Sequence, residues 1–443
     1  MKFLTLLCIS LLSSMAAFAN SAETLKMLDL FGDVFEKVRQ EYVEAPEDKE
    51  LLESAINGML RDLDPHSSYL NAETFKEMQV QTKGEFGGLG IEVTMKDGLV
   101  YVVSPIDDTP AYNAGVEAGD YISHIDEESV VGMTIKDAVE RMRGKPKTPI
   151  LVTILREGED EPFDIEIIRD IITIKAVKSK IYDDIAYLRV TTFSEQTVNG
   201  AEEQLKTMLD EIDDNIKGLV LDLRSNPGGL LTQAIGLSDM FLDKGEVLST
   251  RGRRPESAKR FNATAGDMMN GLPIAVLING GSASASEIVA GALQDHRRAL
   301  ILGTKSFGKG SVQTVIPLDK ENAIKVTTSR YYTPSGRSIQ AEGIEPDIIV
   351  ENADISLKKE KRQRKEADLK GQIGKGDLKN DKEPANDNDP KGVSKLIDEV
   401  KKEEGEAENI YETDYQLGRA IDLLRGLYLY NQADESTNIS QYR

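Results

Sequence analysis

The feature that most constrains the fold is a regular alternation of apolar strands and amphipathic helices between residues 173 and 355. The candidate strands are short, largely apolar runs at 185–190, 217–224, 273–279, 298–303, 311–318 and 323–332. The candidate helices lie between the earlier strands, at 196–214, 230–243 and 284–296. Strands that are apolar on both faces need cover on both faces, and helical crossovers supply it. We therefore expect an α/β domain built around a largely covered sheet.

Residues 85–172 have a different pattern, in which short β-rich runs alternate with turns. The stretch "GGLGIEVTMKDGLVYVVSPI" holds two such runs split by a hairpin signal, and "AGVEAGDYI" follows. This order resembles a PDZ domain, whose carboxylate-binding loop would be Gly87-Gly88-Leu89-Gly90. Glycine-rich backbone N–H groups can bind a peptide's terminal carboxylate while the adjacent strand edge pairs with the peptide. An all-β module without a ligand is the alternative.

The N-terminal end is predicted to be a targeting segment followed by helices. Lys2, an apolar run and Ala17-Phe18-Ala19 are typical of a cleaved signal peptide over residues 1–19. A short membrane anchor and, through Cys8, a lipoprotein are the alternatives. Residues 23–84 have apolar residues at helical spacing, and Pro65 ends the second helix.

The C-terminal end is predicted to be a linker and a final helix. Residues 356–395 are charged and lack apolar periodicity, which favours a disordered linker. The segment 396–443 contains "YQLGRAIDLLRGLYLY", whose apolar stripe needs a partner surface. We expect that surface to belong to the N-terminal helices, in the same or another chain.

Charge and cysteine content exclude several kinds of partner. The formal net charge of −22 disfavours both a nucleic-acid partner and anionic membrane surfaces. The single cysteine lies in the predicted signal peptide, so the mature chain would use no disulfide. No His/Cys/Asp cluster has metal-ligand spacing, and we expect neither a metal nor a cofactor.

Three serines stand where a predicted strand turns into a helix, in "NGGSASASEI" (279–288). A serine at such a junction is exposed, and the free N–H groups of the first helical turn can stabilise an oxyanion. One serine could instead be a simple N-cap. One cap needs only one serine, however, and the preceding glycines indicate a close approach to the backbone.

A nucleophilic serine needs a base, and a histidine is poorly placed to supply one. The chain has three histidines, His66, His124 and His296, and none fits a Ser-His-Asp triad. Lys309 is the better candidate because glycines flank it. To act as a base its pKa must fall from about 10.4 toward roughly 7–8. Lys305 is the competing lysine but lacks the glycine flanks.

Two further features complete the predicted site. If residues 309–315 are extended, Gln313 shares a face with Lys309 and can orient its amine. The turn in "LDLRSNPGGLL" (221–231) can place the N–H of Gly229 beside that of Ala285 as an oxyanion hole. An ordinary glycine-rich strand-to-helix turn is the alternative.

Long motifs of the chain resemble the C-terminal processing peptidases, also called tail-specific proteases. The motifs are "NGGSASASEIVAGALQDHRRALILGTKSFGKGSVQTV", "LDLRSNPGG", "RYYTPSGRSIQAEGIEPD" and "DPHSSYL". The resemblance implies Ser284 as nucleophile, Lys309 as base with Gln313 as its partner, and Gly229 and Ala285 as oxyanion-hole donors. It implies an α/β crotonase-like (ClpP/crotonase) peptidase core at 173–355 with an inserted PDZ domain and flanking N- and C-terminal helices.

The expected function is therefore an exported serine endopeptidase of the periplasm or cell envelope. It would act on protein substrates with free C-termini, assemble as a homo-oligomer through its terminal helices, and accept substrates from an adaptor that no segment identifies. A catalytically silent PDZ adaptor and a crotonase-type acyl-CoA enzyme are the alternatives from other classes. The intact Ser-Lys-Gln set disfavours the first, and export disfavours the second.

Overall fold

The protein divides into two compact units in a computed structural model that describes residues 2–212, 215–355 and 410–440. One unit comprises Met1–Lys76 with Gln313–Thr328, and the other comprises Glu77–Val312 with Ser329–Arg443. The predicted linker at 356–395 and residues 396–409 lie outside the described residues. No described helix is both long and apolar enough to cross a bilayer.

The first unit contains the helices predicted near the N-terminus. Helix α1 spans Lys2–Glu41, α2 spans Asp48–Arg61, and strand β1 (Ser68–Leu70) pairs antiparallel with the start of β18 (Ala323–Tyr332). Between α2 and β1, the carboxylate of Asp64 accepts hydrogen bonds from the N–H groups of His66 and Ser67, so the chain turns where Pro65 predicted a break. In the part of α1 whose side chains the structure describes, most large apolar side chains are exposed, including Leu28 and Phe31.

The predicted PDZ region folds as an antiparallel sheet with its own core. Strands β3 (Ile91–Lys96), β4 (Leu99–Pro105), β5 (Tyr121–Ile125), β7 (Pro149–Leu155) and β8 (Phe163–Ile168) follow one another across the sheet, and β6 (Glu128–Ser129) pairs with β5. Helix α3 (Ala72–Lys83) precedes β2 (Glu85–Gly88), which pairs with β9 (Asp170–Thr173); the short helices are α4 (Pro110–Asn113) and α5 (Ile135–Met142). Val100 and Val152 are among the buried core residues. Strand β3 forms one edge of the sheet.

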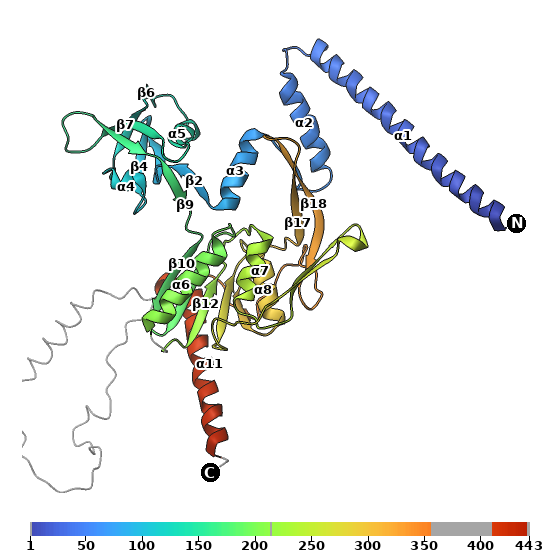
Figure 1. The fold of residues 1–443 in the computed structure, drawn as a ribbon. Helices are drawn as coiled ribbons and strands as arrows, with labels where there is room; N and C mark the ends of the chain where they lie inside the picture. Colours follow the sequence, from blue (N-terminus) through green and yellow to red (C-terminus); the bar gives the residue numbers. More distant parts are fainter. Residues whose placement is uncertain (1, 213–214, 356–409, 441–443) are drawn as a thin grey trace, which may run out of the picture. The chain divides into compact units, whose positions relative to one another are not determined.

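The peptidase-like core is a six-stranded sheet with one antiparallel edge. Its order is β10 (Val177–Tyr182), β11 (Ile185–Val190), β12 (Gly218–Asp222), β15 (Ile274–Ile278), β16 (Ala299–Gly303) and β19 (Ile348–Ile349). All neighbours except the β10–β11 pair are parallel. Helices α6 (Thr197–Ile212), α7 (Leu231–Asp239) and α8 (Ala285–Asp295) follow β11, β12 and β15, as expected for helical crossovers (Figure 1).

Successive side chains of a buried strand point to opposite faces of the sheet, and each face packs in its own apolar cluster. Leu219 and Leu221 of β12 pack in the cluster that includes side chains of α6, α7 and α8. Val220, between them, packs instead with Leu417 and Ile421 of the C-terminal helix. The two clusters confirm that both faces of the sheet are covered.

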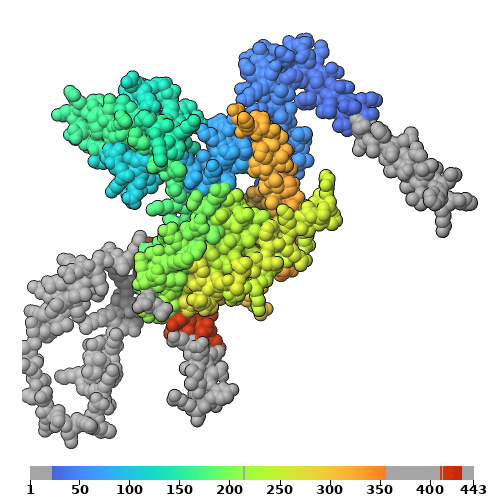
Figure 2. All heavy atoms as spheres, in the orientation of Figure 1, coloured from blue at the N-terminus to red at the C-terminus, as the bar shows by residue number. Residues whose placement is uncertain are grey.

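The C-terminal helices are α10 (Ile410–Thr413) and α11 (Tyr415–Ser440). The apolar stripe of α11 lies on the sheet of its own chain, where Leu424 is fully buried. Figure 2 shows the described part of α11, in red, against the core. The expectation that this stripe docks on the N-terminal helices or between subunits is therefore wrong. The sheet had a second apolar face to cover, and α11 is the element that covers it.

A smaller sheet completes the core. Strand β13 (Glu246–Gly252) pairs with β14 (Lys259–Asn262) on one side and with the end of β18 on the other, while β17 (Ser311–Pro317) also pairs with β18. A short 3-10 turn η1 (Pro255–Ser257) joins β13 to β14. Thr250 lies opposite Tyr331 in this sheet.

Candidate active site

Ser284 occupies the junction between β15 and α8, with an uncommon backbone conformation. It is the N-cap of α8, with φ 58° and ψ −109°. A positive φ costs energy in a residue with a side chain, and such strain is concentrated at functional sites. The side chain of Ser284 is only partly buried, whereas Ser282 and Ser286 are fully buried. Of the three serines, Ser284 is the one a substrate can reach.

The two outer serines hold the turn in place. Ser282 Oγ donates to the carbonyl oxygen of Leu223 at 2.8 Å, and Ser286 Oγ donates to that of Asn226 at 3.0 Å. Both bonds tie the start of α8 to the loop that follows β12. Neither the Ser282 nor the Ser286 hydroxyl therefore caps α8, and both hold the turn in shape.

Two backbone N–H groups flank Ser284 and are available to a ligand. Within the described residues, no hydrogen bond uses the N–H of Gly229 or of Ala285. Gly229 has φ 146°, and an added Cβ there would lie 2.2 Å from the carbonyl oxygen of Phe193, so only glycine fits. The preceding residue, Gly228, packs directly against Ser284 and Ala285. The expected role of these two N–H groups as oxyanion-hole donors stays a prediction.

Two sets of hydrogen bonds hold the loop that carries Lys309 to the junction between β15 and α8. The N–H of Lys309 donates to Glu287 Oε2 at 2.9 Å. Its carbonyl oxygen lies 2.5 Å from the hydroxyl of Tyr331, which is also 3.0 Å from Ser284 Oγ. Burial raises the pKa of Tyr331, so the hydroxyl keeps its single proton. A carbonyl oxygen can only accept, so the Tyr331 hydroxyl donates its proton to the carbonyl oxygen of Lys309. In the contact between Tyr331 and Ser284, the hydroxyl of Ser284 is therefore the donor.

Sequence reasoning missed both Glu287 and Tyr331. Ser284 and Glu287 have the S-x-x-E spacing of a capping box, and that signal was present in the sequence. Tyr331 had no local signal, because it reaches the site only through the pairing of β18 with β13.

Gln313 lies on β17, and its side-chain amide donates to Thr327 Oγ1 at 3.3 Å. Its expected role as the partner of the Lys309 amine stays a prediction.

The competing bases have other partners. His296 stands at the C-terminal end of α8 and contacts the carbonyl oxygen of Glu246 at 2.8 Å. His124 contacts Ser123 in β5, and His66 belongs to the turn before β1. Lys305 forms an ion pair with Glu345 at 2.6 Å.

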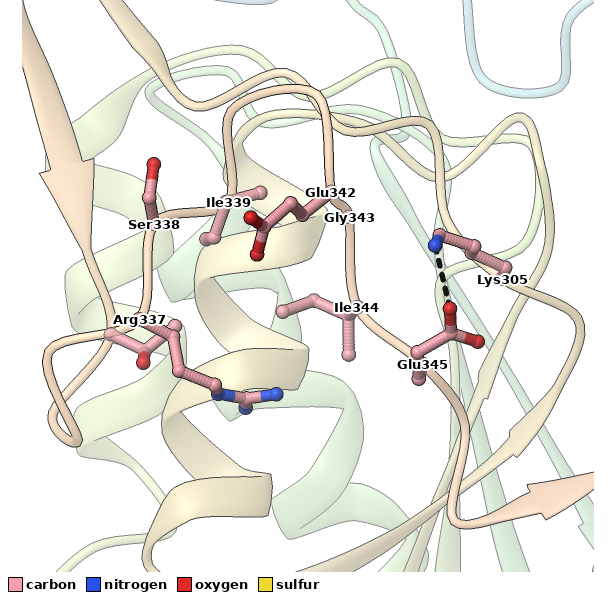
Figure 3. Close-up of a pocket in the computed structure, with 9 residues that line it drawn as sticks. Lys305, Arg337, Ser338, Ile339, Glu342, Gly343, Ile344 and Glu345 are labelled. Carbon is pink, nitrogen blue, oxygen red and sulfur yellow. Dashed lines mark ion pairs between the residues drawn. The ribbon is translucent and has the colours of Figure 1, made fainter.

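A cavity of about 260 Å³ lies beside the Lys305–Glu345 ion pair. Figure 3 shows Lys305 directed toward Glu345, with Arg337 at the other side of the cavity. Neither Ser284 nor Lys309 lines it. The cavity is thus separate from the candidate active site.

The predicted carboxylate-binding loop has two parts. Gly87 and Gly88 belong to β2, opposite Ile171 and Asp170, and Leu89-Gly90 make the turn into β3. The side chain of Leu89 is buried in the PDZ core. In the part of the chain that the structure describes, no hydrogen bond uses the N–H of Leu89 or Gly90. These donors next to an edge strand match the way in which PDZ domains bind peptides.

Among residues 2–212, 215–355 and 410–440, no group of three or more His, Cys, Asp and Glu side chains is arranged to hold a metal ion.

Family models match three successive parts of the chain. Residues 11–74 match the "Activating protease CtpB N-terminal domain", residues 87–167 match the "PDZ domain", and residues 184–350 match "Peptidase family S41". The last two fall within the ranges 85–172 and 173–355 predicted from the sequence.

Relatives with similar sequences align with this chain along most of their length. A carboxy-terminal-processing protease of Bartonella bacilliformis is 53% identical over 416 residues, which cover 92% of this chain and 90% of that protein. Carboxy-terminal processing protease CtpA of Bacillus subtilis is 35% identical over 331 residues, covering 74% of this chain and 70% of that protein. A solved structure of the photosystem II D1 C-terminal processing protease is 27% identical, covers 73% of this chain and 92% of its own, and superposes with a TM-score of 0.41. The chain thus belongs to the carboxy-terminal processing serine proteases of peptidase family S41, with a PDZ domain preceding the peptidase core.

Proposed function

We propose that this protease is exported to the periplasm or cell envelope, where it selects proteins by their free C-termini and processes or degrades them. The observation that carries the catalytic part is the setting of Ser284. It is a strained, partly exposed serine beside two backbone N–H groups that no described hydrogen bond uses.

The proposed reaction uses Ser284 as nucleophile and neutral Lys309 as general base. Lys309 takes the hydroxyl proton as Ser284 attacks the peptide carbonyl, and Gln313 orients the lysine amine. The N–H groups of Gly229 and Ala285 stabilise the oxyanion. Lys309 then protonates the leaving amine, and water hydrolyses the acyl-enzyme.

Substrate selection is assigned to the PDZ domain. A peptide would pair with the edge strand β3, and the N–H groups of Leu89 and Gly90 would bind its terminal carboxylate. Arg143, whose guanidinium lies 4.8 Å from the ring of Phe86, adds positive charge near Gly88.

Export and assembly rest on the N-terminal part of the chain. Residues 1–19 have the pattern of a signal peptide. The exposed apolar residues of α1, among them Leu25, Leu28 and Phe31, support a homo-oligomer through this helix, most simply a dimer. Light scattering of the mature chain at micromolar concentration tests this, and a monomeric mass would contradict it.

An adaptor that delivers substrates is compatible with this proposal, although no described segment identifies one.

Cleavage of casein by the purified protein tests the catalytic proposal. Wild-type protein should cleave casein, whereas Ser284→Ala and Lys309→Ala should not. Each variant should keep the wild-type melting temperature, which separates lost chemistry from lost folding. A silent PDZ adaptor would bind a C-terminal peptide without cleaving casein, and full activity of Ser284→Ala would refute the assignment.

A further inference from the structure

Glu287 is a buried carboxylate one turn into α8, directly behind the nucleophile. Its exposed fraction is 0%. It accepts four hydrogen bonds, which come from both sides of the candidate active site. A buried charge of this kind is retained only when its oxygens are fully satisfied.

The two oxygens of Glu287 have different partners. Oε2 accepts from the N–H of Ser284 at 2.7 Å and from the N–H of Lys309 at 2.9 Å. Oε1 accepts from Ser306 Oγ and from the N–H of Gly308, each at 2.6 Å. One oxygen atom therefore binds the backbones of both the candidate nucleophile and the candidate base.

All four partners of Glu287 are donors. The three N–H groups cannot accept, and the hydroxyl of Ser306 donates to Oε1 while it accepts from the N–H of Ile344 at 2.7 Å. Only an ionised carboxylate offers two oxygens that accept without donating. A neutral side chain of the same shape would place a donor against donors.

We propose that Glu287 is a positioning residue that fixes the backbone of Ser284 relative to that of Lys309. Ser284 and Lys309 are on separate segments, one opening α8 and one preceding β17, and Glu287 joins them through a single atom. Tyr331 makes an independent link between the same two residues, through Ser284 Oγ and the Lys309 carbonyl. This inference rests on the proposed roles of Ser284 and Lys309.

The main test is Glu287→Gln. In one orientation of the amide, its NH2 group would face the N–H groups of Ser284 and Lys309. In the other it would face the N–H of Gly308, next to Lys309, so in both the segment that carries Lys309 would shift away from the one that carries Ser284. A misplacement of about 1 Å at a reacting group costs about 100-fold in rate. We expect kcat to fall about 100-fold while KM and the affinity of the PDZ domain for a C-terminal peptide stay unchanged. Labelling of Ser284 by a fluorophosphonate should slow by a similar factor.

The matched control is Asp267→Asn. Asp267 lies in the same core and also accepts four hydrogen bonds, from Arg298 Nε and Nη2 and from the N–H groups of Met269 and Gly271. Its substitution should lower the melting temperature and leave kcat unchanged well below that temperature. A role of Glu287 in stability alone predicts this same behaviour for Glu287→Gln.

A second variant covers the case in which Glu287→Gln does not fold. Glu287→Asp keeps the charge, but its carboxylate is one methylene too short to bind both amides, so a folded Glu287→Asp should also lose kcat at constant KM. Wild-type kcat in either folded variant overturns the inference. If Ser284→Ala and Lys309→Ala are inactive in the same assay, that result leaves the proposed function standing. If those two variants are active, the proposed function itself fails.

Discussion

Replacing Asp414 by Asn tests whether the C-terminal helix supports the loop that carries Gly229. Arg224 lies in this loop, just after β12. Its Nη1 and Nη2 donate to the two carboxylate oxygens of Asp414 at 2.8 and 2.6 Å, and its Nε donates to the buried Asp222. Asp414 also caps α11, since its Oδ1 accepts from the N–H of Leu417. Asn is as good an N-cap as Asp, so the substitution removes the charge pair and keeps the cap.

The size of the effect follows from the burial of the pair. The side chain of Arg224 is 11% exposed and that of Asp414 is 28% exposed. A hydrogen bond to a charged group contributes about 1.5–3 kcal/mol, and Asn keeps one of the two acceptors. After allowance for partial solvent screening, we expect the free energy of unfolding to fall by about 2 kcal/mol. For a domain of this size that lowers the melting temperature by about 4–8 °C.

The pH dependence of this effect has a defined sign. Burial alone would raise the pKa of Asp414, but the hydrogen bonds and charge of Arg224 outweigh it and hold the pKa below its ordinary value. The unfolded chain has the ordinary value of about 3.9. The stabilisation by Asp414 is therefore complete above that pH and is lost as the pH falls through the lower, folded pKa.

Thermal unfolding followed by circular dichroism at neutral pH and at pH 3 measures both quantities. The difference between wild type and Asp414→Asn should be largest at neutral pH and should shrink at pH 3. Asp183→Asn is the control, because Asp183 pairs with Arg425 of the same helix but its side chain is 86% exposed, so little change is expected. Equal melting temperatures for wild type and Asp414→Asn at neutral pH would refute the reasoning.

The remaining predictions concern catalysis and recognition. Ser282→Ala and Ser286→Ala should keep measurable cleavage of casein, because their hydroxyls shape the turn without attacking; complete inactivity of both, with the fold intact, would contradict this. The rate should rise with pH through an apparent pKa well below about 10.4, as expected for a desolvated Lys309, and a rise only near pH 10 would argue against that base. A peptide with an amidated C-terminus should bind about tenfold more weakly than the same peptide with a free carboxylate, since a charge-assisted hydrogen bond is lost. Equal cleavage of the two peptides would show that the PDZ domain does not recognise the C-terminal carboxylate. EDTA should leave activity unchanged, and a loss restored by zinc would contradict a Ser-Lys mechanism.

The main elements of the peptidase core could be predicted because each strand and helix has a local pattern. Strand β15 is apolar at every position, and β12 is apolar except for its first residue, Gly218, and its last, Asp222. Such apolar runs predict strands that are covered on both faces. Strands β13 and β14 were not predicted. Their residues are mixed in polarity, and their pairing depends on β18, far along the chain.

The candidate site was predictable to the extent that it depends on short motifs. Three of its parts are each encoded by one contiguous sequence motif: the serine turn, the Gly228-Gly229 turn and the lysine between glycines. The contact of Tyr331 with Ser284 was not predictable, because it joins elements that meet only in the folded sheet. The stripe on α11 was predicted correctly, but its partner was wrong, since an apolar stripe specifies that it must be covered and not what covers it.

The cover that α11 provides has a consequence for the order of events during synthesis. Domains fold as their residues emerge, and emergence proceeds at about 5–20 residues per second. The strands and the residues assigned to catalysis are all made before residue 410, yet one face of their sheet stays uncovered until α11 follows. Because Asp414 also binds the Arg224 loop, the loop that carries Gly229 gains this support only after residue 414 has been made.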